Sequence, residues 1–586
     1  MSYTVINGND NGAGSLRDAL AQAVLSPVDF NINFDPAVTV VTLESTLSVN
    51  NGSIATININ GNGSGVLTIT RNVLAADFRI FNIVTSLLNI SGVTISNGAA
   101  TAVGPAGLGG GLNISNSTMI FNDVIITNNT ARFGGGIFSN LSNLTMTNVD
   151  VAANVATLVP GSSGGGLLLS GGTTNMNNIN IYNNNVNGFD GGGIFCNGII
   201  LTINNMSLYN NSVTGNPLAN NGGGIFIAAG TVTNISNSVI YNNLASRGGG
   251  IFITSSSMLN MVNTTISNNI VSDAGAAILF ASVSDSSSLI NSTISGNSSG
   301  TLGAINITAN APASVTLGNT IVAQNTTLDN TPPDISGAFV SLGTNLFGIY
   351  DGSTASGIDP TDLSGTQATP LDAMLQPLAD NGGPTLTMAI PIDSPAVNAG
   401  NDAIIPAGVI YDQRGPFFAR ISGLSVDIGA FEYVFAVICF AADSLVLVKN
   451  ILTGIIEAIP VCQIFNDIHL VYSVTDDCYV PIKLNIVTGK IDRLVKITKG
   501  LLGIAMPSED FFLTSGHYID INGALIKAAN IPGRMRIKVP PQDVYSICTE
   551  TETLIKVNNI NVATWAYNSW MTKSKKTGIN WTNNQK

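Results

Sequence analysis

An internal repeat between residues 85 and 345 constrains the fold of this chain more than any other feature. Each copy contains an Asn followed six residues later by a second Asn, and successive copies begin 25 to 32 residues apart, with Asp123 in the first, variant copy. A Gly-rich triplet follows most copies, as at Gly164–Gly166. Repeats of roughly 20 to 50 residues build solenoids, because each copy packs on the next. The first Asn of each regular pair is Asn148, Asn178, Asn205, Asn237, Asn263, Asn291 or Asn319.

The residues between the paired Asn predict β-strands. Apolar and small polar residues alternate there, as in NSVIYNN (237–243) and NSTISGN (291–297), which is the period of a strand and not of a helix. A strand, a tight turn at the Asn and a corner that Gly permits describe one coil of a parallel β-helix. Equivalent residues of stacked coils lie about 4.8 Å apart, so the Asn side chains can form hydrogen-bonded ladders. We therefore predict an all-β chain.

The coils and their two ends resemble right-handed parallel β-helix surface proteins. The start, NGNDNGAGSLRDALAQA (7–23), is similar to their N-terminal cap, in which a short helix covers the first coil. The segments DNGGPT (380–385) and DIGAFE (427–432) are similar to their C-terminal closing segment. The resemblance implies a cap at 1–40, coils at 41–345 and a closing segment at 346–433. It implies no single activity, because proteins of this fold do many things.

The distribution of charge separates the chain into two parts. Up to residue 438 there are seven Arg, no Lys and 23 acidic residues, a net charge of −16, whereas residues 439–586 carry a net charge of +3. The overall net charge of −13 argues against a nucleic-acid partner, because such proteins neutralise phosphates with Lys and Arg. We predict a second all-β domain at 434–570, made of short β-branched strands, and a basic tail at 571–586.

The second part contains a Cys near its start and a Thr-x-x-His motif far downstream. These residues are Cys439, Thr514 and His517. Together they resemble the signature of the Hint fold, which is shared by hedgehog autoprocessing domains and inteins. The strands NDIHLVYSV (466–474) and HYIDINGALIKAANI (517–531) are also similar to strands of that fold. The resemblance covers about 439–567.

The Hint resemblance implies self-cleavage of the bond between Ile438 and Cys439. The Cys439 thiol would attack the carbonyl carbon of Ile438 and replace the peptide bond by a thioester, while His517 protonates the departing amine. Thr514 would hydrogen-bond the scissile amide. The sequence departs from the hedgehog pattern in having Ile438 where those proteins have Gly, and it lacks the terminal His-Asn of inteins, so splicing is not expected.

Other polar residues of the second part carry weaker expectations. Asp443 and Asp477 are candidate acids for a second chemical step, although turn or capping roles suit them better. Cys462, Cys478 and Cys548 lack the spacing of zinc ligands. We therefore expect no metal site and no cofactor.

Two further functions remain open for the β-helix. The first is a tailspike-like polysaccharide depolymerase, which would need carboxylates that converge on one face; the coils offer Asp123, Asp150, Asp190, Asp273 and Asp285. The second is a structural protein or adhesin that binds a glycan or a cell-surface receptor, with an inactive Hint-like domain. A homotrimer or a larger surface assembly is compatible with either reading.

The sequence also bears on location. It has no apolar run of about 18 residues, so we expect no transmembrane segment. The start lacks the basic and apolar regions of a signal peptide, and the five Cys have no regular spacing, which indicates synthesis in a reducing compartment. These features are compatible with a component of a virion or of a cell surface.

Overall fold

The chain folds into two compact units. In the computed structural model, the first, which we call the solenoid unit, spans Met1–Ile421 and Ser425–Tyr433, and the second, the C-terminal unit, spans Ser422–Leu424 and Val434–Lys586. The structure describes residues 1–586 except 158–160, 216–219, 255, 282–285, 309–314, 329–333, 352–354, 417, 423–424, 434–439, 442, 466–467, 476, 483, 498–510, 514–517, 522–523, 528–530, 532–533, 550–553, 558–559, 564, 567–581 and 584–586.

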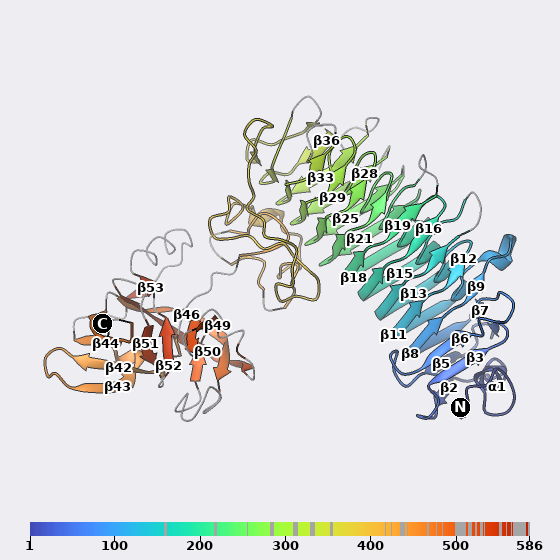
Figure 1. Cartoon of the computed structure of the whole chain (residues 1–586), viewed down its shortest axis with the longest axis horizontal. Helices are drawn as coiled ribbons and strands as arrows, with labels where there is room; N and C mark the ends of the chain where they lie inside the picture. The colour runs from blue at the N-terminus through green and yellow to red at the C-terminus, as the bar shows by residue number, and fades with distance from the viewer. Residues whose placement is uncertain are drawn as a thin grey trace. The chain divides into compact units, whose positions relative to one another are not determined.

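The solenoid unit is a parallel β-helix of about 12 turns (Figure 1). Its described strands form a 31-stranded sheet and a nine-stranded sheet. Strands of successive coils pair in parallel with no shift of the repeat, so that Tyr182 faces Tyr209 and Asn180 faces Ser207. The all-β class and the solenoid predicted from the repeat are thereby confirmed.

The strands of the coils stack in four ladders, the fourth of which begins at β9 (Ala99–Ala100). The first ladder contains β1 (Ser2–Val5), β2 (Phe30–Phe34), β5 (Thr56–Asn60), β8 (Leu87–Ser96), β11 (Thr118–Thr127), β13 (Ile137–Ala152), β15 (Leu167–Tyr182), β18 (Ile200–Tyr209), β21 (Val232–Ser236), β25 (Met258–Val262), β29 (Ser287–Ile290), β33 (Val315–Gly318) and β37 (Val340–Ser341). The second uses the ends of β8, β11, β13, β15 and β18, together with β3 (Val40–Leu43), β6 (Thr68–Arg71), β22 (Val239–Tyr241), β26 (Thr265–Ser267), β30 (Thr293–Ser295), β34 (Ile321–Ala323), β38 (Leu346–Phe347) and β40 (Leu363–Ser364).

The remaining two ladders complete the coil. The third uses the starts of β13 and β15, together with β4 (Leu47–Val49), β7 (Phe81–Val84), β10 (Leu112–Ser115), β17 (Ile194–Asn197), β20 (Ile225–Ile227), β24 (Ile251–Ile253), β28 (Ile278–Phe280), β32 (Ile305–Ile307), β36 (Ile335–Ala338) and β39 (Ala355–Ser356). The fourth contains β9 (Ala99–Ala100), β12 (Thr130–Ala131), β14 (Val155–Ala156), β16 (Asn185–Asn187), β19 (Ser212–Thr214), β23 (Leu244–Ala245), β27 (Ile270–Val271), β31 (Ser298–Ser299) and β35 (Thr326–Thr327). A short 3₁₀ turn at Gly104–Gly107 interrupts one corner.

A helix, α1 (Leu16–Ala23), covers the first coil. Ser15 caps it by accepting a hydrogen bond from the Asp18 amide at 3.2 Å, as a helix N-terminus requires. Its Leu16 and Leu20 side chains are buried in the same core as the inward Ile and Leu of the coils. The helix therefore closes the end of the hydrophobic core that no preceding coil can cover.

A ladder of buried Asn side chains runs along the inside of the solenoid unit. Each Asn Nδ2 donates to the Asn Oδ1 of the next coil at 2.9–3.0 Å, and the same Oδ1 also accepts from a backbone amide. The ladder ends on Asp334, which accepts from Asn325 Nδ2 at 2.8 Å. Buried amides are stable only when every polar atom is paired, and this arrangement pairs them coil by coil. Its members are Asn129, Asn154, Asn184, Asn211, Asn243, Asn269, Asn297 and Asn325.

The Gly triplets pack against the neighbouring coil. A Cβ on Gly165 would lie 2.3 Å from the Gly192 carbonyl oxygen, which is less than any real contact allows. Gly164 has a φ of +68°, where side chains are disfavoured. The triplets are therefore required by the close approach of backbones and not by a ligand.

The described residues of 371–421 and 425–433, which we call the strap, fold back along the outside of the second ladder. Thr385 Oγ1 donates to the Asn237 carbonyl at 3.1 Å, Thr265 Oγ1 donates to Gln413 Oε1 at 2.6 Å, and the Ala430 amide donates to Thr293 Oγ1 at 2.9 Å. The strap contains a single 3₁₀ turn among its described residues, at Asp402–Ile404. It covers the outer face of β26, β30 and β34 and reaches back to the coil that contains β22.

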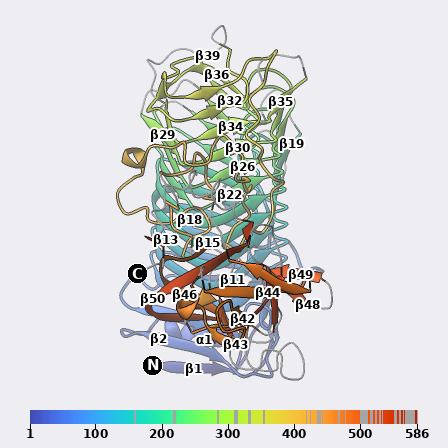
Figure 2. The ribbon, with the colours of Figure 1, turned by 90° about the vertical axis from the view of Figure 1, so that its left-hand side faces the viewer.

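The described strands of the C-terminal unit form two sheets in which all pairs are antiparallel except β50 with β53, which is parallel (Figure 2). One contains β41 (Phe440–Ala441), β46 (Leu484–Ile497), β47 (Phe511–Leu513), β50 (Met535–Thr549), β53 (Trp565–Ala566) and β54 (Thr582–Asn583). The other contains β42 (Leu445–Asn450), β43 (Ile456–Pro460), β44 (His469–Ser473), β45 (Cys478–Pro481), β48 (Tyr518–Ile521), β49 (Ala524–Lys527), β51 (Leu554–Val557) and β52 (Ile560–Ala563). A 3₁₀ turn lies at Val461–Gln463. The described part of the chain holds no helix that is both long enough and apolar enough to span a membrane.

Candidate functional site

The seven Asn named from the repeat lie at the bend between the first and second ladders. All seven have positive φ values of 48° to 58°, a conformation that Asn tolerates better than most residues. Asn178 Nδ2 donates to Asn148 Oδ1 at 2.6 Å, and Asn319 Nδ2 donates to Asn291 Oδ1 at 3.0 Å. The continuous buried ladder is made by the second Asn of each pair. Both sets contain hydrogen bonds that link neighbouring coils.

The described carboxylates of the coils have separate partners. Asp123 accepts from Ser64 Oγ at 2.7 Å, whereas Asp150 accepts from Asn180 Nδ2 at 2.9 Å. A glycosidase would need two carboxyl groups that face one substrate. Asp123 and Asp150 instead accept hydrogen bonds from different parts of the solenoid unit and share no partner.

Two further coil carboxylates follow the same pattern, and Asp285 lies outside the described residues. Asp273 accepts from Thr301 Oγ1 at 3.2 Å. Asp190 accepts from Asn221 Nδ2 at 2.8 Å, and burial raises the pKa of its carboxyl group to about 6. Each of these carboxylates fastens one coil to the next.

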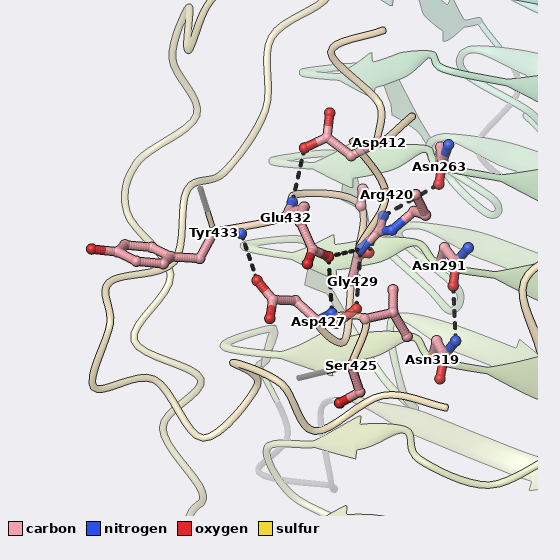
Figure 3. A network of polar contacts seen from close by, with 12 residues as sticks. Asn263, Asn291, Asn319, Asp412, Arg420, Ser425, Asp427, Gly429, Glu432 and Tyr433 are labelled. Atoms are coloured by element: carbon pink, nitrogen blue, oxygen red, sulfur yellow. Dashed lines mark hydrogen bonds and ion pairs between the residues drawn. The ribbon is translucent and has the colours of Figure 1, made fainter. Parts of the chain in front are cut away.

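A buried charged network fastens the strap to the coils (Figure 3). Its members are Asp412, Arg414, Arg420, Asp427 and Glu432, which are 0–5% exposed. Arg414 pairs with Asp412 at 2.6 Å, and Arg420 pairs with Glu432 at 3.0 Å. Arg420 Nη1 also donates to Asn263 Oδ1 on a coil at 3.3 Å.

Two properties of this charged network indicate a structural role. The Arg414 guanidinium lies between the rings of Phe418 and Phe431, 3.8 and 3.7 Å from their centroids. Burial raises the pKa of the Asp427 carboxyl group to about 6, and two backbone amides, of Asn398 and Tyr433, donate to it. Because these groups are buried and already paired, the network is better suited to holding the strap on the coils than to catalysis.

A row of three stacked tyrosines lies on the outer face of the second ladder, in the coil that the strap just reaches and in the two coils before it. Tyr182 and Tyr209 have ring centroids 5.0 Å apart with planes 3° from parallel, and Tyr209 and Tyr241 are 4.9 Å apart at 11°. The three rings are partly exposed. In each coil the Tyr comes directly after the last inward-facing apolar residue and directly before two Asn, as in INIYNN, MSLYNN and SVIYNN. The recurring Tyr-Asn-Asn is the sequence signal for this tyrosine row, and the predictions made from the paired Asn did not use it.

A second row of polar residues runs beside the tyrosines. Asp150, Asn180 and Ser207 occupy equivalent positions of successive coils, two residues before each position of the tyrosine row. In the next coils the corresponding residues are Val239, Thr265 and Thr293, all three of which are buried, and the strap forms hydrogen bonds with the two Thr. The face is thus divided into a covered half and an open half.

Four residues predicted for self-cleavage, Ile438, Cys439, Thr514 and His517, lie outside the described residues. The strands next to them are described: β41 begins one residue after Cys439, and β47 ends one residue before Thr514. These two strands pair antiparallel, with Phe440 opposite Leu513.

The other polar residues of the C-terminal unit have local roles. Asp477 is exposed and accepts a hydrogen bond from the Tyr472 hydroxyl, and Asp443 is exposed in a turn. His469 is buried and its Nδ1 accepts from the Phe465 amide at 3.1 Å. Among the described residues, no group of three or more His, Cys, Asp or Glu side chains could hold a metal ion.

Comparison with known proteins gives distant structural matches. No family model matches the chain, and no curated protein matches it. The pectate lyase Pel9A is 13% identical, with 74% of this chain and 97% of that chain aligned and a TM-score of 0.35. The surface adhesin PfbA of Streptococcus pneumoniae is 13% identical, with 66% and 96% aligned and a TM-score of 0.26. The A-module of the mannuronan C-5 epimerase AlgE4 of Azotobacter vinelandii is 10% identical, with 60% and 100% aligned and a TM-score of 0.25.

The assignment of the fold does not depend on these matches. It rests on the parallel registers, which join equivalent residues of successive coils throughout the solenoid unit.

Proposed function

We propose that this protein is a β-helical surface or stalk protein whose C-terminal unit is a Hint-type autoprocessing domain. The observation that supports it most directly is the antiparallel pairing of Phe440 with Leu513. Residues next to such a pair face each other in antiparallel strands. In the sequence Cys439 directly precedes Phe440 and Thr514 directly follows Leu513, so this pairing agrees with an arrangement in which the Cys and the Thr-x-x-His motif act together.

The proposed reaction begins with an N-to-S acyl shift. The Cys439 sulfur bonds to the carbonyl carbon of Ile438, the C–N bond of the peptide breaks, and the amine of Cys439 takes a proton from His517. Thr514 donates a hydrogen bond to the scissile amide and holds it in place. Water or an external thiol then attacks the thioester and releases a fragment that ends at Ile438.

Ile438 sets the rate in this proposal. Its β-branched side chain crowds the carbonyl carbon that the thiolate must reach. Replacing it with Gly should accelerate cleavage, because Gly removes that obstruction.

In this proposal the solenoid unit is the part of the protein that is displayed on the surface and binds the partner. It carries no Lys up to residue 438 and a net charge of −16, which suits a partner other than nucleic acid. We assign it a glycan or a cell-surface receptor as partner, on a virion or a cell surface, with a homotrimer or a larger surface assembly as its assembled form.

The test is the intact mass of the full chain with and without dithiothreitol. Cleavage that yields a fragment ending at Ile438, that increases with the thiol and that is lost in Cys439→Ala and His517→Ala supports the proposal. Cys478→Ala is the matched control, because Cys478 is an exposed thiol of the same unit. An intact wild-type chain under every condition, or cleavage that persists in Cys439→Ala, contradicts it.

A further inference from the structure

The open half of the tyrosine face has the properties of a binding surface. The row Tyr182, Tyr209 and Tyr241 and the row Asp150, Asn180 and Ser207 run parallel along the solenoid axis. Along each strand the two rows are offset by two positions, so that their Cα atoms lie about 6.6 Å apart. Hydroxyl, amide and carboxylate groups are therefore repeated at the spacing of the coils.

The covered half of the same face shows that these positions accept polar partners. There Thr265 Oγ1 donates to the side-chain oxygen of Gln413, and the Ala430 backbone amide donates to Thr293 Oγ1. Both Thr lie in the row that continues Asp150, Asn180 and Ser207. The strap stops at the coil of Asn237, where Thr385 makes its contact. The open rows continue this interface, and the coils change from Ser and Thr to Tyr where the strap ends.

The chemistry of the open half favours an uncharged partner. Its two rows contain one carboxylate, Asp150, and no basic residue. Burial and its neighbours Tyr241, Tyr182 and Asp150 raise the pKa of the Tyr209 hydroxyl to about 12, so this hydroxyl is protonated at neutral pH and can both donate and accept. A polyanion would be repelled by Asp150, because no Arg or Lys in these rows offsets it.

From these observations we propose that the open tyrosine face binds a linear neutral oligosaccharide that lies along the solenoid axis, one sugar unit to each coil. The coils are spaced about 4.8 Å apart, close to the length of one hexose unit in an extended chain. Tyr rings offer apolar edges to the C–H groups of the sugar, and the Tyr hydroxyls, Asp150 and Asn180 offer partners for its hydroxyls. This proposal rests on the glycan partner assigned to the solenoid unit above, but it does not depend on cleavage at Cys439, because the site lies wholly in the solenoid unit.

Stacked tyrosines also stabilise parallel strands without any ligand, so the test must separate the two roles. Tyr209→Phe keeps the ring stack and removes one hydroxyl. Asp150→Asn keeps the shape of the side chain and removes the charge. Asn175→Ala is the matched control, since Asn175 is exposed on the same strand as Tyr182 but in the first ladder.

The full chain is titrated with neutral β1,4-linked glucose, N-acetylglucosamine and mannose oligomers from disaccharide to hexasaccharide, and with oligogalacturonate as the charged counterpart. We expect affinity for one neutral series to rise with length up to about one sugar for each open coil. Tyr209→Phe and Asp150→Asn should each weaken binding roughly fivefold to tenfold with an unchanged thermal midpoint, and Asn175→Ala should bind as the wild type does.

Three results would overturn the proposal. The first is the absence of binding to every neutral series. The second is tighter binding of oligogalacturonate than of any neutral oligomer. The third is unchanged binding in both Tyr209→Phe and Asp150→Asn, which would place the sugar elsewhere and leave the tyrosines a purely structural stack.

Discussion

The solenoid unit and the C-terminal unit are both built from β-strands, but they pair them in opposite ways. In the solenoid unit each strand pairs in parallel with the equivalent strand of the next coil, one repeat away in sequence. In the C-terminal unit the short strand β41 pairs antiparallel with β47 and with β50, both far downstream. The repeat therefore predicts the neighbours of a residue in a coil. The neighbours of a residue in the C-terminal unit are known only when segments far apart in the sequence have folded together.

The same contrast separates structural from functional residues within the solenoid unit. The buried Asn recurs at one position in eight successive coils, as a structural requirement would. The Tyr occurs at its position in three coils only, next to the single Asp150. Departures from the repeat are thus the better guide to function in this unit.

The largest effect is expected for Phe440→Ala in the C-terminal unit. Phe440 is 1% exposed and belongs to β41, which joins β47 to β50. The cavity should cost about 3 to 5 kcal/mol of stability. Hydrogen exchange should increase in the strands of the C-terminal unit and stay unchanged in the coils. Faster exchange in the coils would show that the contrast between the units is wrong.

Asn211→Leu tests the buried ladder. Asn211 lies in its middle, and the substitution removes the oxygen that accepts from the Asn184 backbone amide and Nδ2, together with the Nδ2 that donates to Asn243 Oδ1 and to the Ile181 carbonyl. We expect a loss of about 3 kcal/mol, because buried unpaired polar groups each cost about 1 to 3 kcal/mol. Asn175→Leu, on the exposed face, should change stability by less than about 0.5 kcal/mol. Equal effects in chemical denaturation would refute the structural role of the ladder.

Gly165→Ala compares a crowded with an open glycine. The new Cβ would meet the Gly192 oxygen at 2.3 Å, so neighbouring coils must separate, at a cost of about 2 kcal/mol. Gly198 has a φ of +60° with nothing within 4 Å, so Gly198→Ala should cost only about 1 kcal/mol of backbone strain. A smaller loss for Gly165→Ala than for Gly198→Ala, by thermal unfolding, would contradict the packing argument.

Stability should rise as the pH falls from 8 to 5. Burial raises the pKa of Asp334 to about 7 and that of Asp427 to about 6 in the folded protein, above their values in the unfolded chain. The folded state therefore binds more protons in this range and gains on the order of 2 kcal/mol, which disappears as the pH rises through these pKa values. The thermal midpoint at the two pH values measures it, and Asp334→Asn should reduce the difference. A midpoint that falls at pH 5 would be the opposite of this expectation.

The smallest effect is expected for Asp123→Asn. Asp123 has a φ of 55° at the bend position that Asn148 occupies in the next coil, and it accepts hydrogen bonds from Ser64. Asn suits this conformation and keeps one acceptor, so stability should change by less than about 0.5 kcal/mol. A large loss in denaturant would give the Asp123 charge a role that the repeat does not explain.

These residues show how far sequence reasoning reached. The repeat predicted the solenoid because its period is local and the same pairing recurs in each coil. It identified the bend asparagines such as Asn148, but it did not separate them from the buried Asn154 set, since burial depends on which side of the strand faces the core. The Tyr row was overlooked because alternation by itself marks it only as outward-facing.

The sequence by itself determined the all-β class and the stacking of equivalent residues. Both follow from short-range periodicity, which any coil expresses wherever it lies in the chain. Only the tertiary structure decided that the strap covers Thr265 and Thr293 while Tyr182 and Tyr209 stay open, and that Phe440 meets Leu513. Those contacts join residues without a shared period, and only the folded chain brings such segments together.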